Sequence, residues 1–348
     1  MINLTIDDKQ IAVAENTTVL EAAQQLKIDI PTLCHDSRLK PFGACRLCIV
    51  EIEGMAKPVT SCTTPATEGM IVKTQSDRLY RLRKTTVELL LSDHPNECMT
   101  CISAGDCKLQ ELVYSFDIRN NRFGGEMRAH NSLDKNPFIY RVQNKCVMCG
   151  LCVRVCEEVQ GVGAIGFAER GFEAKITPPF GHDLNCEFCG QCVSVCPTGA
   201  LSGKVWAGYP RKGGDVETET TCTYCGCGCN LTLHSQGDKV FKVTSDPTNH
   251  NRGWLCVKGR FGFEFINSEE RLTTPLIRRE KGGEFETASW GEALDMIASR
   301  MQDIKKEHGP DALGGLTSAR CTNEENYLFQ KLFRAGIGTN NVDHCARY

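Results

Sequence analysis

The stretch that decides the fold is a duplicated cysteine motif, with CVMCGLCVRVC at residues 146–156 and CEFCGQCVSVCP at residues 186–197. In both copies the cysteines are separated by two, two and three residues, and chance does not explain such a repeat. Thiols at this spacing are typical of ligands to iron–sulfur clusters. The repeat therefore predicts a small domain at residues 137–203 that holds two [4Fe-4S] clusters.

Both copies resemble the cluster motifs of bacterial ferredoxins. In that family three cysteines of one run share a cluster with the last cysteine of the other run. Pro197 follows the second run as in the family, whereas Glu157 takes that place in the first. A domain this small has little apolar core, so ligation must supply much of its folding stability. The resemblance assigns Cys146, Cys149, Cys152 and Cys196 to the first site, and Cys186, Cys189, Cys192 and Cys156 to the second.

The composition of the whole chain limits the classes of protein that it can represent. Its 348 residues, 41% hydrophobic and 24% charged, describe a soluble globular protein with room for several domains. A net charge of −3 gives no reason to expect nucleic acid as a partner, since phosphates require a basic surface. Without a signal sequence or a stretch near the ~18 apolar residues of a membrane span, we expect a cytoplasmic protein with no membrane span.

Nineteen of the 22 cysteines fall into five groups with metal-ligand spacing. A disulfide framework is the alternative, but it suits short secreted chains, whereas a reducing compartment leaves thiolates free for metal. Cys321 and Cys345 lie outside these groups, and for both we expect a packing role and not a catalytic one.

Residues 1–78 predict a β-grasp fold. Apolar residues alternate through 2–6 and resume at 11–13 after a turn, which indicates a hairpin, and Thr18 is placed to cap the helix VLEAAQQL. Gly43 lets the backbone fold closely around sulfur. A structural zinc site is the alternative to iron, but the long first loop departs from zinc spacing. The predicted ligands of one [2Fe-2S] cluster are Cys34, Cys45, Cys48 and Cys62.

Residues 79–118 begin with an amphipathic helix around 78–91 and continue into HPNECMTC at 94–101. This pattern predicts a [4Fe-4S] site in which histidine replaces one thiolate, which raises the reduction potential because histidine is neutral. Considered alone, His94 is more typical of a surface or cap residue; its position before a Cys-x-x-Cys pair favours a ligand. The predicted ligands are His94, Cys98, Cys101 and Cys107.

The first two cluster modules resemble those of the complex I electron-input subunit and of [FeFe]-hydrogenases. After a linker rich in glycine and charge at 208–220, the module at 216–271 resembles instead the cluster domain of molybdenum or tungsten bis-pterin oxidoreductases. That resemblance implies a [4Fe-4S] cluster held by Cys222, Cys225, Cys229 and Cys256, with Cys227 unligated. It also places Lys258 between cluster and pterin, as an electron relay or anion contact, although a lysine there is usually a solvated charge.

Residues 272–348 predict the start of an α/β catalytic domain, with helices at 288–306 and 323–336 and a strand at 312–318. The run GTNNVDHCARY at 338–348 resembles the formate dehydrogenase branch of the bis-pterin enzymes. The resemblance implies a molybdenum or tungsten bis(pterin guanine dinucleotide) cofactor, with Gly338, Asn340 and Asn341 near the pterin nucleotides. Gly338 has an alternative role as a helix cap. A cysteine or selenocysteine metal ligand is expected directly after Tyr348, and we hypothesise that the sequence stops at a selenocysteine codon.

Together these modules predict an α+β multidomain protein with one [2Fe-2S] and four [4Fe-4S] clusters. The resemblance implies the catalytic subunit of a formate dehydrogenase or carbon dioxide reductase, and we expect this chain alone to be inactive toward formate. The expected partner, in a hetero-oligomeric complex, is a flavin-containing NAD-reducing subunit, a ferredoxin-type protein or a hydrogenase module. Two alternatives remain: a complex I-like input subunit without substrate chemistry, and an [FeFe]-hydrogenase-related relay, against which the Cys222 motif argues.

Overall fold

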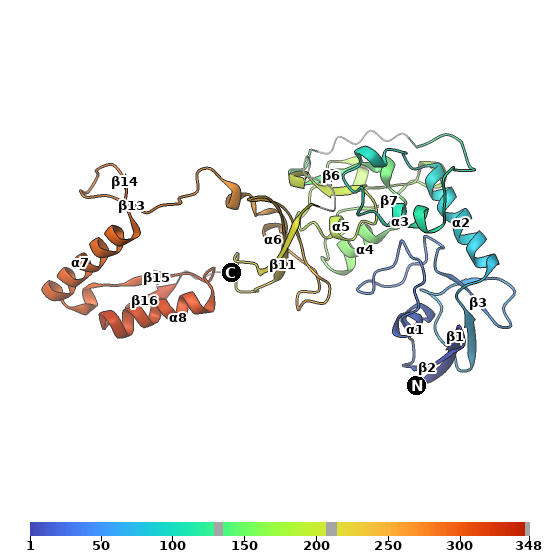
Figure 1. Ribbon diagram of the computed structural model, residues 1–348, viewed down its shortest axis with the longest axis horizontal. Helices are drawn as coiled ribbons and strands as arrows, with labels where there is room; N and C mark the ends of the chain where they lie inside the picture. The colour runs from blue at the N-terminus through green and yellow to red at the C-terminus, as the bar shows by residue number, and fades with distance from the viewer. Residues whose placement is uncertain (129–134, 207–213, 345–348) are drawn as a thin grey trace. The chain divides into compact units, whose positions relative to one another are not determined.

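The computed structural model describes residues 1–128, 135–206 and 214–344. The chain divides into two compact units, Met1–Asp215 and Val216–Tyr348, and Figure 1 shows the course of the chain through each. The expected mixture of α and β structure is confirmed. In the described part of the chain, no helix is both long enough and apolar enough to cross a membrane.

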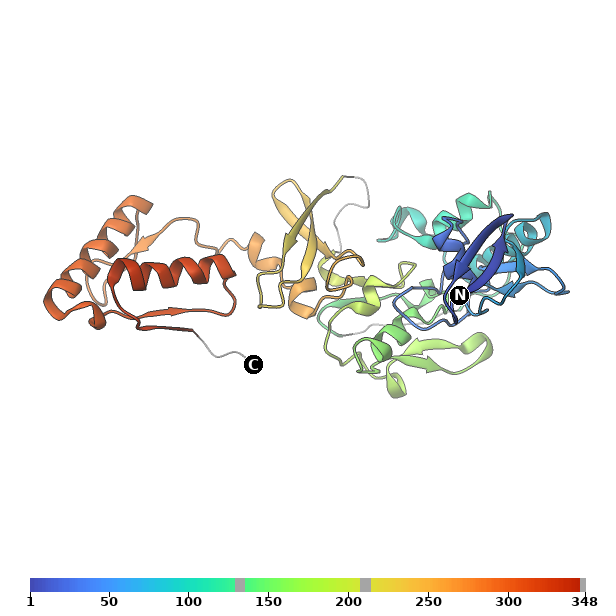
Figure 2. The same ribbon diagram turned by 90° about the horizontal axis from the view of Figure 1, so that it is seen from below.

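The first unit begins with a five-stranded sheet and one helix, as the sequence predicts. The hairpin of β1 and β2 turns through Asp7 and Asp8, which both have positive φ, and is drawn in blue in Figure 2. Strand β1 pairs in parallel with β5 and antiparallel with β2, so the N-terminal strand is an inner strand of the sheet. The strand order is β2-β1-β5-β3-β4, and the elements are β1 (Ile2–Ile6), β2 (Lys9–Val13), α1 (Val19–Gln25), β3 (Ile49–Ile52), β4 (Val59–Thr60) and β5 (Met70–Lys73).

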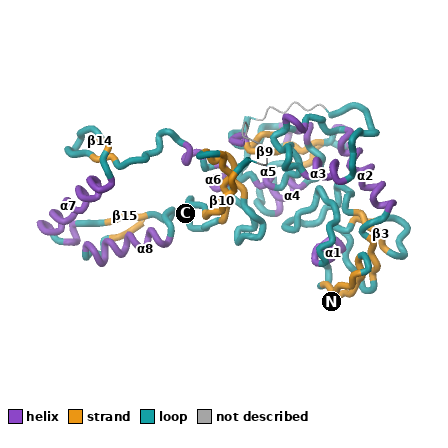
Figure 3. The backbone as a smooth tube through the Cα atoms, in the orientation of Figure 1, coloured by secondary structure: helices purple, strands orange, loops and turns teal. Residues whose placement is uncertain are grey.

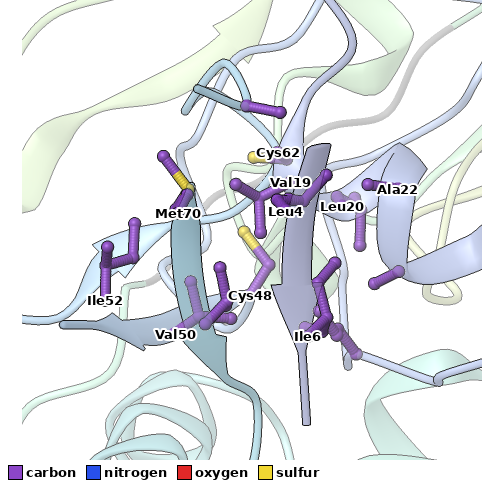
Figure 4. Close-up of a cluster of buried hydrophobic side chains, with 14 of the residues drawn as sticks. Leu4, Ile6, Val19, Leu20, Ala22, Cys48, Val50, Ile52, Cys62 and Met70 are labelled. Carbon is purple, nitrogen blue, oxygen red and sulfur yellow. The ribbon is translucent and has the colours of Figure 1, made fainter. Parts of the chain in front are cut away.

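Helix α1 begins at the predicted cap. The Thr18 hydroxyl accepts a hydrogen bond from the Glu21 amide at 3.2 Å, and the Glu21 carboxylate accepts one from the Thr18 amide at 2.7 Å. Figure 4 shows the core beside this helix, where the sulfur atoms of Cys48 and Cys62 lie among apolar side chains such as Leu4. Two predicted cluster ligands are therefore part of the hydrophobic core.

Helix α2 (Asp77–Ser92) is joined to this sheet by a buried arginine. Arg83 is 6% exposed, and its guanidinium donates to the carbonyl of Leu47 at 3.1 Å and to that of Ile49 at 2.6 Å. Leu47 lies between the predicted ligands Cys45 and Cys48. The arginine therefore supports the backbone that carries the first site.

The rest of this unit consists of short elements in long loops, as Figure 3 shows around α3, α4 and α5. The two cysteine repeats adopt the same backbone: Met148 and Phe188 have φ of 53° and 50°, and Gly150 and Gly190 have φ of 72° and 71°. Each glycine is the N-cap of the helix that follows. The elements are α3 (Lys108–Ser115), β6 (Ile139–Arg141), α4 (Leu151–Glu158), β7 (Gly166–Ala168), β8 (Lys175–Thr177), α5 (Gln191–Ser194) and β9 (Leu201–Gly203).

The second unit starts with an antiparallel sheet of β10 (Val216–Thr221), β11 (Asn230–Gln236) and β12 (Lys239–Thr244). Part of the predicted linker at 208–220 is therefore strand β10, and residues 208–213 lie outside the described residues. The remaining elements of this unit are α6 (Val257–Phe261), β13 (Leu276–Ile277), β14 (Glu286–Thr287), α7 (Trp290–His308), β15 (Gly315–Thr317), α8 (Asn323–Lys331) and β16 (Val342–His344).

Strands β15 and β16 pair in parallel, with α8 between them in the chain. A Cβ on Gly315 would lie 2.7 Å from Phe329 and Phe333, so the glycine allows the helical segment to pack on the strand. The helix and strand predicted in this region are confirmed, whereas β16 occupies residues that the sequence indicated only as a cofactor-binding run. The result is a βαβ unit, the expected opening of an α/β domain.

Replacing Arg83 by methionine tests the support of the first site. The carbonyls of Leu47 and Ile49 then stay buried without partners, and we expect a loss of about 1–3 kcal/mol in the free energy of unfolding. Chemical denaturation of the cluster-loaded chain, followed by visible absorption, measures this loss. The matched control is Arg81→Met on the exposed face of α2, which should change stability by less than about 0.5 kcal/mol. An unchanged midpoint for Arg83→Met would contradict the role.

Candidate iron–sulfur sites

The first site brings together four buried cysteines, Cys34, Cys45, Cys48 and Cys62. They form two hydrogen-bonded pairs, Cys34 with Cys45 and Cys48 with Cys62. The hydrogen bond from each partner thiol lowers the pKa of Cys45 and that of Cys48 to about 6, and raises the pKa of the two donors. Each pair therefore offers one thiolate near neutral pH, which is the form that binds metal.

The spacing of the sulfur atoms bears on the choice between iron and zinc. In the described part of the chain, no three cysteine sulfurs lie within 4.8 Å of one another. A tetrahedral zinc ion with bonds of about 2.3 Å requires all four sulfurs to lie within about 4 Å of one another. Two separate pairs instead match two iron atoms that each take two thiolates. The four residues fit a [2Fe-2S] cluster.

The loop around this site is shaped for close approach. Gly43 has φ +71°, and a Cβ there would lie 3.1 Å from the Thr63 side chain. The amide of Cys45 points at the Cys34 sulfur at 3.4 Å, and the amide of Leu33 points at the Cys45 sulfur at 3.4 Å. Amide donors to sulfur stabilise negative charge and tune the reduction potential of a bound cluster.

His94 has the geometry of a metal ligand. Its Nδ1 lies 3.1 Å from the carbonyl oxygen of Pro95, and because a carbonyl only accepts, Nδ1 carries the proton. The Nε2 lone pair is then free, and this atom is buried without a hydrogen-bond partner. Burial lowers the pKa of the ring, which keeps it neutral. A neutral imidazole whose second nitrogen is fixed by a carbonyl is the usual form of a histidine ligand.

The cysteines predicted to share this second site lie near one another and near the ferredoxin repeat. Burial raises the pKa of Cys107, and repulsion from Cys101 and Cys98 adds to the increase. A Cβ on Gly199 would lie 2.7 Å from the Cys101 sulfur, so the turn after the second repeat passes directly over this site. Three neighbouring cysteines, preceded in the chain by a neutral histidine with an available Nε2, have the chemistry that a [4Fe-4S] cluster with one histidine ligand requires.

The structure brings together the two crossed sets that the ferredoxin resemblance implies. Cys156 lines one small cavity together with the first three cysteines of the second repeat, Cys186, Cys189 and Cys192. Cys196 in turn interacts electrostatically with the first three cysteines of the first repeat, Cys146, Cys149 and Cys152. Burial is the main cause that raises the pKa of Cys149 to about 12. Metal binding at these sites must therefore release protons.

The second unit gathers the last four predicted ligands. The Cys222 amide donates to the Cys229 carbonyl at 2.8 Å, and Cys229 interacts electrostatically with Cys222, Cys225 and Cys256. Cys227 is exposed, as is Cys321, so the expected packing role of Cys321 is wrong: its position before α8 leaves the thiol in solvent. Cys345 lies outside the described residues.

Lys258 is exposed on α6 and lines a pocket of about 340 Å³ together with Cys222, Tyr224 and Arg271. The walls of this pocket include apolar side chains of β11 and β12. Two cations beside a predicted cluster ligand suit an anionic group such as a pterin phosphate. This placement is compatible with both roles that the sequence suggested for Lys258.

The residues of the predicted pterin run have structural partners. Gly338 has φ 93° and ends the helical segment Leu332–Ile337, with its amide donating to the Phe333 carbonyl at 2.8 Å, which is the alternative role expected for it. The Asn341 side chain donates to the Asp311 carbonyl at 2.9 Å and so holds β16 in place. Asn340 is exposed at the same turn.

Two residues near these sites have no signal in the sequence. His35 follows the ligand Cys34, and its Nε2 is also buried without a partner. Arg154 lies between Cys152 and Cys156 and is 7% exposed. In the sequence, the only feature that could have indicated either residue is its position next to predicted cluster ligands.

Comparison with known families matches five segments of the chain. Residues 1–77 match the 2Fe-2S iron–sulfur cluster binding domain, and residues 83–122 match the NADH-ubiquinone oxidoreductase-G iron–sulfur binding region. Residues 136–202 match the ferredoxin-like domain of NADH-quinone oxidoreductase subunit 3. Residues 215–268 match the molybdopterin oxidoreductase Fe4S4 domain, and residues 271–348 match molybdopterin oxidoreductase. The chain thus belongs to the molybdopterin oxidoreductases that carry iron–sulfur domains.

Individual relatives narrow this assignment. The chain is 42% identical to NADPH-Fe(3+) oxidoreductase subunit alpha of Geobacter sulfurreducens, over 100% of this chain and 40% of the relative. It is 40% identical to an NADH-quinone oxidoreductase subunit of Rhizobium meliloti, again over 100% of this chain and 40% of the relative. The chain is therefore homologous to this NADH-quinone oxidoreductase subunit and spans about 40% of the length of these curated relatives.

A solved structure shares the fold of part of the chain. An NAD+-reducing [NiFe]-hydrogenase is 32% identical with a TM-score of 0.55, and the match covers 58% of this chain and 87% of that one. These relatives are named for pyridine nucleotides and hydrogen, so formate remains a proposal.

Exchanging single ligands tests the crossed assignment. Cys156→Ser should remove the cluster of the second repeat, because Cys156 lies with Cys186, Cys189 and Cys192. Cys152→Ser should remove the cluster of the first repeat, because Cys152 lies with Cys146 and Cys149 of its own run. Iron and acid-labile sulfide analysis with EPR of the reduced chain distinguishes the two losses. If both variants lost the same cluster signal, the predicted exchange of the fourth cysteine between the two repeats would be refuted.

Replacing His94 by cysteine tests the histidine ligand. The added negative charge should lower the reduction potential of this cluster and leave its iron content unchanged. An EPR-monitored redox titration measures the shift. His35→Asn is the matched control, because His35 is a second half-buried histidine with a buried Nε2 and its loss should leave that signal in place. An unshifted signal in His94→Cys would show that His94 is not a ligand.

Proposed function

We propose that this chain is the electron-relaying part of a formate dehydrogenase, or carbon dioxide reductase, that holds a molybdenum or tungsten bis-pterin cofactor. The observation that carries the proposal is the combination of the Cys222 module with a βαβ unit whose last strand, β16, lies within the run GTNNVDHCARY. A pure relay has no chemical reason to keep that run. The metal ligand expected after Tyr348 is not part of this chain, and the proposal leaves both cysteine and selenocysteine open there.

The iron–sulfur clusters, when bound, supply one-electron centres, and the metal–pterin cofactor supplies two-electron chemistry. The residues of this chain hold and tune these groups. The buried cysteines exclude water, the amides around Cys34 and Cys45 favour negative charge, and neutral His94 makes its site less negative than an all-cysteine site. Lys258 and Arg271 supply positive charge beside Cys222, where an anionic group is expected.

The expected partner is a subunit that exchanges electrons with a pyridine nucleotide. Support comes from the relatives, which are named for NADPH, NADH and NAD+. A flavin-containing NAD-reducing subunit agrees best with these names; a ferredoxin-type protein and a hydrogenase module are the other candidates from the sequence. We propose a cytoplasmic hetero-oligomer on the same basis.

A second candidate function is a complex I-like input subunit without substrate chemistry. It is favoured by the 40% identity to an NADH-quinone oxidoreductase subunit over the whole of this chain. The two functions differ in what the longer protein binds: the enzyme requires metal and pterin, and the relay does not.

Cofactor and activity measurements on the full-length protein decide between them. We expect molybdenum or tungsten with pterin, and formate-dependent reduction of viologen, from the full-length protein. The 348-residue chain should contain iron and sulfide but show no formate turnover, because it lacks most of the length of its relatives. Full-length protein that has all its clusters but no pterin would establish the relay instead. Formate turnover by the short chain would contradict the proposed division of roles.

A further inference from the structure

The long loop between the first two ligands of the [2Fe-2S] site is held by helix α4 of the ferredoxin repeat. The Arg154 guanidinium donates to the carbonyl of Cys34 at 2.7 Å and also to the carbonyl of Lys40. The Glu158 carboxylate, one turn further along α4, accepts a hydrogen bond from the Lys40 amide at 2.8 Å. Three hydrogen bonds therefore join residues 34–40 to one face of α4.

An aromatic side chain from the same loop completes this contact. Phe42 lies with its ring centroid 5.2 Å from the Arg154 guanidinium carbon and 6.0 Å from the centroid of Phe167, with 21° between the ring planes. Phe167 belongs to β7 of the ferredoxin repeat. Stacking between a guanidinium and an aromatic ring is a specific and favourable arrangement.

The glycine at the start of α4 makes room for both rings. A Cβ on Gly150 would lie 2.9 Å from Phe167 and 3.0 Å from Phe42. Gly150 directly follows the ligand Cys149, so any shift of the rings is felt at a cluster ligand. We call this contact of Phe42, Gly150, Arg154, Glu158 and Phe167 the α4 clamp.

The α4 clamp lies between predicted ligands of two different clusters. Arg154 is in the helix between Cys152 and Cys156, and its hydrogen bond ends on the backbone of Cys34. The thiols of Cys149 and Cys45 are also close enough to interact electrostatically. Arginine suits this position because its planar fork reaches two carbonyls from one buried side chain.

We propose that Arg154 is a positioning residue that fixes the separation between two cluster sites by holding the loop of residues 34–45 against α4. These are the [2Fe-2S] site and the [4Fe-4S] site of Cys146, Cys149, Cys152 and Cys196. Electron transfer rates fall steeply with distance, so a loop that moves by a few ångströms would slow exchange between the two clusters. The inference rests on the proposed iron–sulfur relay and deepens it, since it names the contact that sets one spacing within the relay.

The test uses the anaerobically purified chain with its clusters and compares Arg154→Gln and Phe42→Leu with wild type. Arg170→Gln, an exposed arginine of the same unit, is the matched control. We expect amide hydrogen exchange in residues 35–44 to become about tenfold faster or more in both clamp variants, since charge-assisted hydrogen bonds or ring contacts are lost. The control should exchange at the wild-type rate.

A spectroscopic measurement separates positioning from general stabilisation. In the fully reduced chain, the spin of the [2Fe-2S] cluster should relax more slowly in the clamp variants, because its magnetic coupling to the neighbouring [4Fe-4S] cluster falls with the cube of the distance. Unchanged exchange and relaxation in variants with full iron content would overturn the role of Arg154. If Arg154→Gln does not fold, Phe42→Leu decides alone. Wild-type chain without both clusters would refute the relay itself and not the clamp.

Discussion

The structure depends on the need to gather sulfur atoms around metal from segments that have little regular structure. In the two ferredoxin repeats the chain meets this need with left-handed turns at matching places. Met148 and Phe188 occupy such turns without being glycine, which costs free energy that the surroundings must offset. Their matching φ angles, and those of Gly150 and Gly190, show that the two repeats use one solution twice. Ligation to metal is the interaction that offsets the free energy cost of these turns.

Burial of the thiols also makes the free energy of folding depend on metal binding. In the ferredoxin repeats, burial disfavours the thiolate and raises the pKa of six predicted ligands, which are Cys146, Cys149, Cys152, Cys186, Cys192 and Cys196. Without metal, these thiols stay neutral. Metal binding exchanges those protons for ligand bonds and couples folding of the repeat to cluster assembly. The first site differs, because two of its thiols, Cys48 and Cys62, lie in a hydrophobic core with Leu4 and residues of helix α1. That part of the chain has apolar packing of its own.

Local features could be predicted from the sequence, and contacts between distant segments could not. The hairpin of β1 and β2 and the Thr18 cap depend on neighbouring residues, and the cysteine sets depend on spacing, so both were predictable. Arg83 and Arg154 reach carbonyls more than 30 residues away, and no pattern in the sequence indicates such partners. Strand β16 was missed because its short run resembled a cofactor motif, and the exposure of Cys321 depends on packing that composition does not encode.

Along its length the chain combines several iron–sulfur domains with the start of a molybdopterin oxidoreductase domain. The central claim is that these cysteines and His94 hold iron–sulfur clusters. Mössbauer spectroscopy of anaerobically purified, iron-57-labelled chain, together with sulfide and zinc analysis, tests it most directly. The account predicts iron and sulfide sufficient for one [2Fe-2S] and four [4Fe-4S] clusters, with negligible zinc. Stoichiometric zinc, or disulfides at these positions in place of iron, would contradict it.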